Sequence, residues 1–339
     1  MPPDLQRRPP GSRGRVGRWL TSLLAAALLL GAPPATALDA TDDDLGARSL
    51  RGESWWTPVL EPADQTRVGP VLPMTPPLSD LYALQPSYYD DGCHVGRART
   101  TLREGCVYGD PTSATEVAMV GDSKIGRLFP ALEEIALREG WALRAYTKSA
   151  CAFVDEPTPG YEACDDYNAA LAEHLAADPP QIVLTGAMRR DVGDGYARTW
   201  QWLRGLGVAH VVGLWDSPAP TGGSPAGCVA EALEEGADLT TCAVPLPEAA
   251  SGNPSMRAGA REVEGASFVD LRDWVCPPSE LNPLCAPVIG RVQLYGSGSH
   301  LSPLYGQTLT DPIHQRLHEA GVAAYRPSVD RVSGPHRQP

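Results

Sequence analysis

Lysine is almost missing from this 339-residue chain, which has only Lys124 and Lys148. The 28 basic residues are therefore nearly all arginine, and 41 acidic residues bring the net charge to −13. Such an acidic chain argues against nucleic acid and anionic membrane surfaces as partners. The arginine bias, together with abundant alanine, glycine and proline, is typical of a GC-rich genome.

Several motifs of cofactor chemistry are also absent. The chain has neither a Walker P-loop nor a Gly-x-Gly-x-x-Gly turn between a strand and a helix, so we expect no nucleotide partner. It has no C-x-x-C pair, which disfavours a zinc site. We predict neither a metal nor a cofactor.

The first 37 residues have the features of a Sec-type signal peptide. Five arginines precede an apolar run at 20–30, and Ala35-Thr36-Ala37 offers a cleavage site. An uncleaved membrane anchor is the alternative interpretation. Cleavage would leave a net charge of about −17, and we expect a secreted or cell-envelope protein.

All eight cysteines follow this segment, which favours disulfide bonds in an exported protein. Their short gaps favour four local loops, although spacing alone leaves other pairings open. The favoured pairs are Cys93 with Cys106, Cys151 with Cys164, Cys228 with Cys242, and Cys276 with Cys285.

The rest of the chain divides into three predicted parts. Residues 38–91 are rich in proline and acids and are expected to form an extended lead-in. Residues 92–326 form the predicted globular domain, and 327–339 a disordered tail. Apolar strands in the domain are expected at 117–120, 141–147, 181–185, 209–215 and 267–271. Helices are expected near 124–138, 165–177, 196–206, 256–263 and 303–320, with an irregular insert after the fourth strand.

This alternation predicts a parallel sheet with helices on both faces, in which ligands bind outside the carboxyl ends of the strands. Gly121-Asp122-Ser123 lies at one such end, where a strand meets a helix. The free N–H groups and the dipole of a helix N-terminus would stabilise both a serine nucleophile and its oxyanion. The alternative is that Asp122 and Ser123 are only helix-capping residues.

A histidine in a small, polar loop could supply the base that serine attack requires. His300 follows Gly296-Ser-Gly-Ser299 and precedes the last predicted helix. Its alternative interpretation is a surface histidine near a helix cap.

Together these residues resemble the SGNH (GDSL-like) hydrolase superfamily, and in particular the SGNH domain fused to acyltransferase family three membrane proteins. The resemblance extends over about 78–317 and depends on the order of several short motifs. These are Tyr88-Tyr-Asp-Asp-Gly-Cys93, Cys106-Val-Tyr-Gly-Asp110, Gly121-Asp-Ser with Phe129-Pro-Ala-Leu132, Thr147-Lys-Ser-Ala-Cys151, Leu214-Trp-Asp-Ser-Pro218, Val269-Asp-Leu-Arg-Asp-Trp-Val-Cys276, Cys285-Ala-Pro-Val-Ile-Gly290 and His300-Leu-Ser302.

The resemblance implies a flavodoxin-like three-layer α/β/α sandwich, with Ser123 as nucleophile and His300 as base. It further implies chemistry on O-acyl groups, commonly acetyl, of cell-surface glycans or glycolipids. A membrane acyltransferase is then a candidate donor partner, because the membrane helices that usually precede this domain are absent from the sequence. Residues expected to line the site or donate to the oxyanion are Asp122, Lys124, Ser149, Ala150 and Gly186.

Three positions depart from the family pattern. Ser297 replaces the aspartate that usually lies three residues before the histidine, so Ser297 itself or a backbone carbonyl would have to orient the ring. Thr185-Gly-Ala-Met188 lacks the oxyanion asparagine of the superfamily. Lys124 stands where the subgroup often has histidine, and its ammonium could face the site or point into water. Asp216 and Asp270 are other acids near strand ends, and a structural role is expected for Asp270.

Three functional interpretations remain open. The first is an exported serine esterase or O-acyltransferase that forms an acyl-enzyme. The second is an inactive SGNH domain that binds envelope carbohydrate or a partner protein, a hypothesis motivated by Ser297. The third is a non-enzymatic secreted domain with an accidental Gly-Asp-Ser, which would place His300 far from Ser123.

Overall fold

A computed structural model of the chain describes residues 45–51, 85–186, 189–221, 223–277 and 284–324, all within one compact unit, 41–339. The predicted signal peptide and the predicted tail lie outside the described residues. Among the helices that are described, none is long and apolar enough to cross a membrane.

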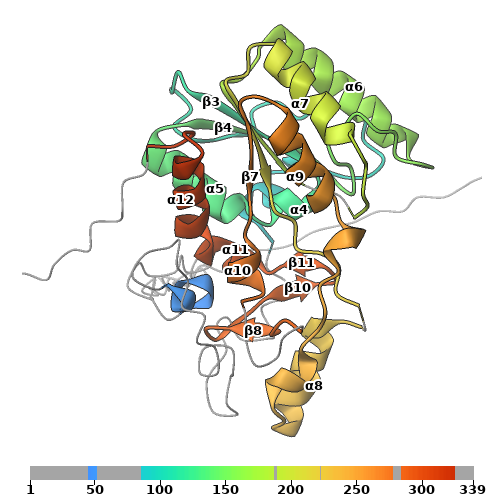
Figure 1. Cartoon of the computed structure of the whole chain (residues 1–339), viewed down its shortest axis with the longest axis vertical. Helices are drawn as coiled ribbons and strands as arrows, with labels where there is room; N and C mark the ends of the chain where they lie inside the picture. Colours follow the sequence, from blue (N-terminus) through green and yellow to red (C-terminus); the bar gives the residue numbers. More distant parts are fainter. Residues whose placement is uncertain (1–44, 52–84, 187–188, 222, 278–283, 325–339) are drawn as a thin grey trace, which may run out of the picture. The chain divides into compact units, whose positions relative to one another are not determined.

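The centre of the domain is a seven-stranded, mostly parallel sheet (Figure 1). Its parallel core has the order β4-β3-β5-β6-β7. The bounds are β3 (Glu116–Gly121), β4 (Ala142–Lys148), β5 (Ile182–Gly186), β6 (His210–Leu214) and β7 (Ala266–Val269). The apolar residues of β3 are fully buried, as expected for a strand covered on both faces. The α/β fold with a parallel sheet is confirmed, and its strand order is that of flavodoxin-like folds.

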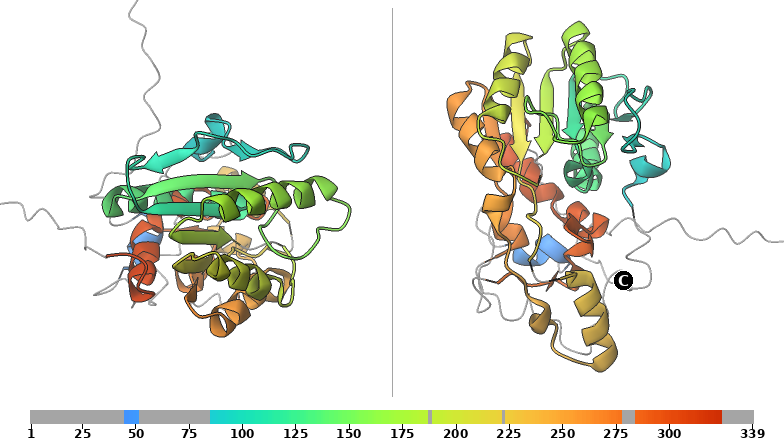
Figure 2. Two further views of the ribbon diagram at one scale, coloured as in Figure 1. Left: turned by 90° about the horizontal axis from the view of Figure 1, so that it is seen from above. Right: turned by 90° about the vertical axis from the view of Figure 1, so that its right-hand side faces the viewer.

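Two short strands add to the edge at β4. Strand β1 (His94–Val95) pairs with the carboxyl half of β4 in parallel, and β2 (Val107–Gly109) pairs with its other half in antiparallel orientation. The segment from α3 (Ser87–Asp90) to β2 therefore lies along this edge (Figure 2). The antiparallel strand β2 was not expected from the sequence, because a three-residue strand has no readable periodicity.

Helices cover both faces of the sheet (Figure 1). On one face α6 (Glu162–Ala177), α7 (Gly195–Gly205) and α9 (Asn253–Glu262) share a buried apolar cluster with the central strands. On the other face lie α5 (Phe129–Glu139) and α12 (Thr310–Glu319). This arrangement confirms the three-layer α/β/α sandwich.

Two of the expected long helices are each divided in two. The first becomes α4 (Ser123–Gly126) and α5, and the last becomes α11 (Pro303–Thr308) and α12. Prolines explain both breaks, because Pro130 and Pro312 have no N–H to continue the hydrogen-bond ladder of the preceding turn. The division leaves α4 as a short helix that carries Ser123 at its first position.

The insert after β6 is more regular than the sequence analysis expected. It contains α8 (Pro225–Glu235) and the short helices η2 (Leu239–Cys242) and η3 (Glu248–Ala250). The signals of α8 are readable in retrospect: Ser224 caps its N-terminus, Pro225 takes the first position, and Gly236 ends it in the left-handed conformation. The remaining described elements are η1 (Gly46–Leu50), α10 (Arg272–Val275), β8 (Val288–Ile289), β9 (Val292–Gln293), β10 (Tyr295–Ser297) and β11 (His300–Leu301).

One part of the lead-in differs from the extended segment that was expected. Residues 46–50 form η1, and Leu45 and Leu50 are fully buried. The backbone N–H of Ala47 donates to the Thr308 hydroxyl at 2.9 Å, which ties this turn to α11. Leucines spaced five apart in a short segment carry no sequence signal strong enough to predict this docking.

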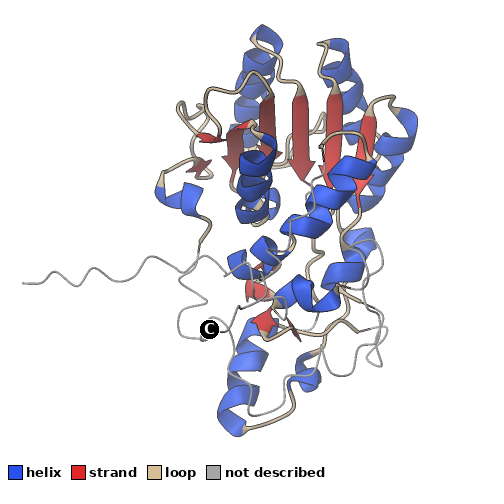
Figure 3. Cartoon of the chain, turned by 90° about the vertical axis from the view of Figure 1, so that its left-hand side faces the viewer, coloured by secondary structure: helices blue, strands red, loops and turns tan. Residues whose placement is uncertain are grey.

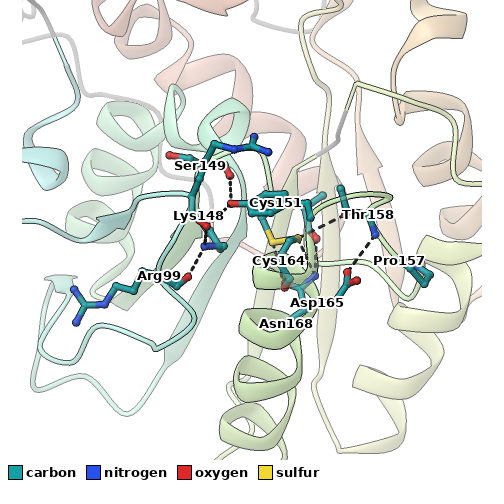
Figure 4. Close-up of a disulfide and its surroundings, with 12 residues drawn as sticks. Arg99, Lys148, Ser149, Cys151, Pro157, Thr158, Cys164, Asp165 and Asn168 are labelled. Atoms are coloured by element: carbon teal, nitrogen blue, oxygen red, sulfur yellow. Dashed lines mark hydrogen bonds between the residues drawn. A yellow bond between two sulfur atoms is a disulfide. The ribbon is translucent and has the colours of Figure 1, made fainter.

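The eight cysteines form the four favoured local disulfides. Figure 4 shows the bridge from Cys151 to Cys164, which joins the turn after β4 to α6. Lys148 lies beside it, buried, and its ammonium donates to the backbone carbonyls of Gly96, Arg97 and Arg99. Four disulfides fit an oxidising environment outside the cytoplasm.

The carboxyl ends of the parallel strands all point toward the part of the molecule that contains β8 to β11 and α8 (Figure 3). The strand order changes direction at β3 and β5, which is where ligands bind in open α/β sheets. Strand β3 leads directly to Ser123.

Candidate active site

Ser123 lies at the first position of α4, immediately after β3. Gly121 has a φ of +136° in this turn, and a side chain there would press on Ile125. Asp122 is the N-cap, and its buried carboxylate accepts the Lys124 N–H at 2.7 Å. Burial raises the pKa of Asp122 to about 7. Asp122 thus caps the helix, while Ser123 remains half-buried and accessible at the positive end of its dipole.

His300 lies on a tight hairpin formed by β10 and β11. Gly298 and Ser299 form the turn, and Gly298 has a positive φ of 54°, which glycine adopts without strain. The buried side chains of Tyr295 and Leu301 anchor the two strands. His300 itself stays half-buried at the end of the hairpin.

The structure brings Ser123 and His300 together across 177 residues of sequence: the Ser123 Oγ lies 2.7 Å from the His300 Nε2. The His300 Nδ1 lies 3.2 Å from the backbone carbonyl of Ser297. A carbonyl only accepts hydrogen bonds, so Nδ1 carries the proton and the lone pair of Nε2 faces the serine hydroxyl. The backbone of Ser297, and not its side chain, orients the ring. This is the tautomer that a general base requires.

The hairpin that carries His300 is fixed to the sheet by Lys124. The Lys124 ammonium donates to the carbonyls of Ser217 at 2.6 Å and Ser299 at 2.8 Å. It also pairs with Asp216 at 3.1 Å, and the two side chains are only 4% and 2% exposed. Lys124 therefore does not point into water. Its ammonium binds the backbone of Ser299, the residue just before His300. The sequence analysis left this orientation open.

The other acids near strand ends do not contact the histidine. Asp216 pairs with Lys124, and burial raises its pKa even with that cation beside it. Asp270 pairs with Arg257 at 2.9 Å and Arg272 at 3.1 Å, as its expected structural role requires. The described residues thus supply no carboxylate partner to the His300 ring.

The surroundings of His300 favour its neutral form. Burial is the main cause that lowers its pKa to about 4, and the positive charges of Arg127 and Lys124 act in the same direction. The Ser297 carbonyl opposes them. The Arg189 guanidinium also lowers this pKa, and it donates to the Ser299 hydroxyl at 2.9 Å. The His300 ring is therefore unprotonated at neutral pH.

The predicted oxyanion residues differ in what they offer. The Ser149 N–H donates to the Val95 carbonyl at 2.9 Å, so this N–H is not available to a substrate. Ala150 is exposed with a φ of 53° in the same turn. A side chain at Gly186 would collide with Ile125, so this glycine allows α4 to approach β5. The N–H of Ser123, at the start of α4, is a backbone donor adjacent to the Ser123 hydroxyl.

Sequence reasoning missed a second group of residues beside the site. The rings of His94 and Tyr89 are stacked, with their centroids 4.3 Å apart. The Arg127 guanidinium lies over the Tyr89 ring, 5.7 Å from its centroid. His94 is close enough to His300 for the charge of His300 to lower the pKa of His94. No pattern marked His94, because it follows Cys93 in an irregular segment. Among the described residues, no cluster of three His, Cys, Asp or Glu side chains could hold a metal ion.

Comparison with known proteins supports the same interpretation of the fold. The model of the family described as "SGNH domain (fused to AT3 domains)" matches residues 92–315. The chain belongs to this family. The SGNH domain therefore occupies most of the chain and includes both Ser123 and His300.

A solved structure is similar to this chain over nearly the full length of the solved domain. It is the periplasmic domain of a lipopolysaccharide acetyltransferase from Salmonella ser. Paratyphi A, with a TM-score of 0.50 and 15% sequence identity. The match covers 71% of this chain and 97% of that one, and at this identity it shows a shared fold. No curated protein matches the chain.

Proposed function

We propose that this protein is an exported serine esterase or O-acyltransferase that acts on O-acyl groups, chiefly acetyl, of cell-envelope glycans or glycolipids. The observation that carries the proposal is the 2.7 Å contact between the Ser123 Oγ and the His300 Nε2 at the N-terminus of α4. Membership in the SGNH family and four disulfides are consistent with an acyl-modifying role outside the cytoplasm.

The geometry supports a two-step reaction. The Ser123 Oγ attacks the ester carbonyl while the His300 Nε2 takes the hydroxyl proton, and the resulting oxyanion accepts the Ser123 N–H. Collapse of the tetrahedral intermediate forms an acyl-serine, and His300 returns the proton to the departing sugar oxygen. A water molecule or a glycan hydroxyl then attacks the acyl-serine by the reverse sequence, which gives hydrolysis or transfer.

The acyl donor depends on which of these two outcomes occurs. The family description names a fusion to AT3 domains, which supports a membrane acyltransferase as the donor partner of this domain. In that case Ser123 would receive the acyl group from the partner and pass it to a glycan. Without such a donor, the same residues would act as an esterase.

One observation favours a second function, a binding domain without catalysis. The His300 ring has only a backbone carbonyl at 3.2 Å where the family has a carboxylate, so the imidazolium formed during attack is less stabilised. A binding domain would retain carbohydrate after Ser123→Ala and release no acyl group.

Acetate release distinguishes the two functions. The purified mature protein is incubated with an aryl acetate and with O-acetylated polysaccharide, with and without a glycan acceptor. We expect acetate or a transferred acetyl group from the wild type. Saturable polysaccharide binding with no acyl chemistry on either substrate would contradict the proposal and support the binding domain.

The pH dependence of kcat/KM should follow the low pKa of His300. His300 is active when unprotonated, and its pKa is lowered to about 4, so kcat/KM should stay level between about pH 5 and pH 7 and fall below about pH 4. An unperturbed histidine would lose activity below about pH 6.5. The measurement is kcat/KM for an aryl acetate from pH 3 to pH 8.

The variant Ser297→Asp tests whether the pKa of His300 sets the acidic limb of the kcat/KM profile. Position 297 is exposed and lies three residues before His300. A carboxylate there should favour the imidazolium, raise the pKa of His300 and move the acidic limb of the profile upward. An acidic limb near pH 6.5 in the wild type would show that burial and the neighbouring cations do not control this base.

A further inference from the structure

A chain of hydrogen bonds lies beside the site and takes no part in the mechanism above. The His94 Nδ1 lies 2.9 Å from the Thr147 hydroxyl, and the His94 Nε2 lies 3.0 Å from the Ser149 hydroxyl. The Thr147 hydroxyl in turn lies 3.1 Å from the hydroxyl of Tyr88. Tyr88 and Thr147 are fully buried, whereas Ser149 is only half-buried.

The buried end of this chain, at Tyr88, determines which group donates in each hydrogen bond. If Ser149 donated to His94, each proton would point inward and the chain would end on a buried tyrosine hydroxyl. The neighbouring Tyr89 hydroxyl is a poor outlet: it lies close enough to Tyr88 for each hydroxyl to shift the other's pKa, but it forms no hydrogen bond of normal geometry within the described residues. A buried donor without an acceptor is destabilising. In the opposite direction Tyr88 donates to Thr147, Thr147 to His94 Nδ1, and His94 Nε2–H to the Ser149 oxygen.

Every buried donor in that second arrangement has an acceptor, and one proton is left over. It belongs to the hydroxyl of Ser149, which, like His94, is only half-buried. Hydrogen bonds in such a series also polarise one another, which strengthens the last donor. The pKa of His94 is lowered to about 4, chiefly by burial, so the ring is neutral and carries a single N–H, as this chain requires.

The sheet brings Ser149 and Ser123 to the same end of two neighbouring strands. Gly121 of β3 is paired with Thr147 of β4. Ser123 and Ser149 each follow two residues later, at the carboxyl ends of these strands. Ser149 is held there by its own backbone, because its N–H donates to Val95 and its carbonyl accepts the Tyr161 hydroxyl at 2.9 Å. Figure 4 shows Ser149 next to Lys148, in the turn that the disulfide from Cys151 to Cys164 joins to α6.

We infer that the Ser149 hydroxyl is a second oxyanion donor and that His94 is the positioning residue that directs its proton into the site. This inference rests on the proposed function. It gives a role to His94, which lies outside the SGNH motifs of the chain, and assigns the oxyanion contact to the side chain of Ser149. The donor would be the side-chain hydroxyl of Ser149, because its backbone N–H already donates to Val95. It would supply the contact that the superfamily obtains from its asparagine.

The first experiment compares turnover of an aryl acetate by variants of the full chain. Loss of one oxyanion donor typically lowers kcat about 10²-fold, so Ser149→Ala should lower kcat by that factor with little change in KM. Ser149→Thr, which keeps a hydroxyl, should retain most of the activity. Ser113→Ala is the matched control and should equal the wild type, because Ser113 lies before the amino end of β3, at the other end of the strand from Ser123.

A double-variant cycle tests whether His94 acts through Ser149. His94→Ala should lower kcat in the wild-type background and have no further effect in the Ser149→Ala background. Equal losses in both backgrounds would show a merely structural role for His94 and overturn the relay. Turnover by the wild type with an unaffected Ser149→Ala variant would overturn the inference while leaving the proposed function intact. A wild type with no turnover at all would overturn both.

The tautomer of His94 provides a second measurement that needs no variant and no turnover. Two-bond ¹H–¹⁵N correlation spectra at neutral pH distinguish a ring protonated at Nε2 from one protonated at Nδ1. We expect the proton on Nε2. A proton on Nδ1 would reverse the chain, direct the Ser149 proton away from the site, and overturn the inference.

Discussion

Ser123→Ala should abolish turnover of an aryl acetate, with kcat at least about 10⁴-fold below that of the wild type. The reason is that no other hydroxyl contacts the His300 Nε2 among the described residues, so nothing replaces the lost nucleophile. His300→Ala should reduce kcat by a similar factor, because a serine hydroxyl without its base is a weak nucleophile. Effects of two residues that act as a unit do not add, so the double variant should be no slower than either single variant.

Covalent labelling tests Ser123 and His300 without the need to choose a substrate. A fluorophosphonate should add once to the wild type, as read by intact mass, and should add to neither Ser123→Ala nor His300→Ala. His210→Ala is the matched control, because His210 lies at the amino end of β6, away from the site. A wild-type protein with intact disulfides that forms no adduct would contradict the activated serine and support the binding domain. Adduct formation by Ser123→Ala would place the nucleophile elsewhere.

Lys124→Met should lower the free energy of unfolding by about 3–5 kcal/mol. The substitution leaves Asp216 buried without its cation, and an uncompensated buried charge is among the most costly defects in a protein. It also removes the donors to the carbonyls of Ser217 and Ser299. We therefore expect kcat to fall as well, because the hairpin before His300 loses its attachment to the sheet. Urea denaturation measures the first effect and aryl acetate turnover the second.

The control variants separate the buried pair from ordinary surface charge. Lys124→Met combined with Asp216→Leu removes both charges, so its loss of stability should be smaller than the sum of the two single losses. Arg198→Met removes an exposed ion pair with Asp155 and should cost less than about 1 kcal/mol. A loss below about 1 kcal/mol for Lys124→Met would show that water or a rearranged loop solvates Asp216.

The pairing of Ser123 with His300 shows what the family motifs add to the periodicity and capping signals of single segments. Periodicity and caps predicted the strand, the turn and the helix around Ser123, and the polar glycine loop before His300. They could not say that the two residues meet, because nothing local connects positions 177 residues apart. The family motifs supplied that expectation, and the strand order β4-β3-β5 shows how the fold accommodates it. The missing aspartate at position 297 was equally visible in the sequence, but not the carbonyl that orients the ring in its place.

The sequence by itself determined the α/β alternation, the sandwich, the favoured cysteine pairs and the two candidate catalytic positions. These depend on short-range physics: apolar spacing, helix caps, prolines and local loop closure, all of which act within a few residues. Only the tertiary structure decided that Lys124 is buried against Asp216 and that His94 lies between Thr147 and Ser149. Those contacts depend on which strands are neighbours and in what register. Such choices arise from the packing of the whole core, and no single segment encodes them.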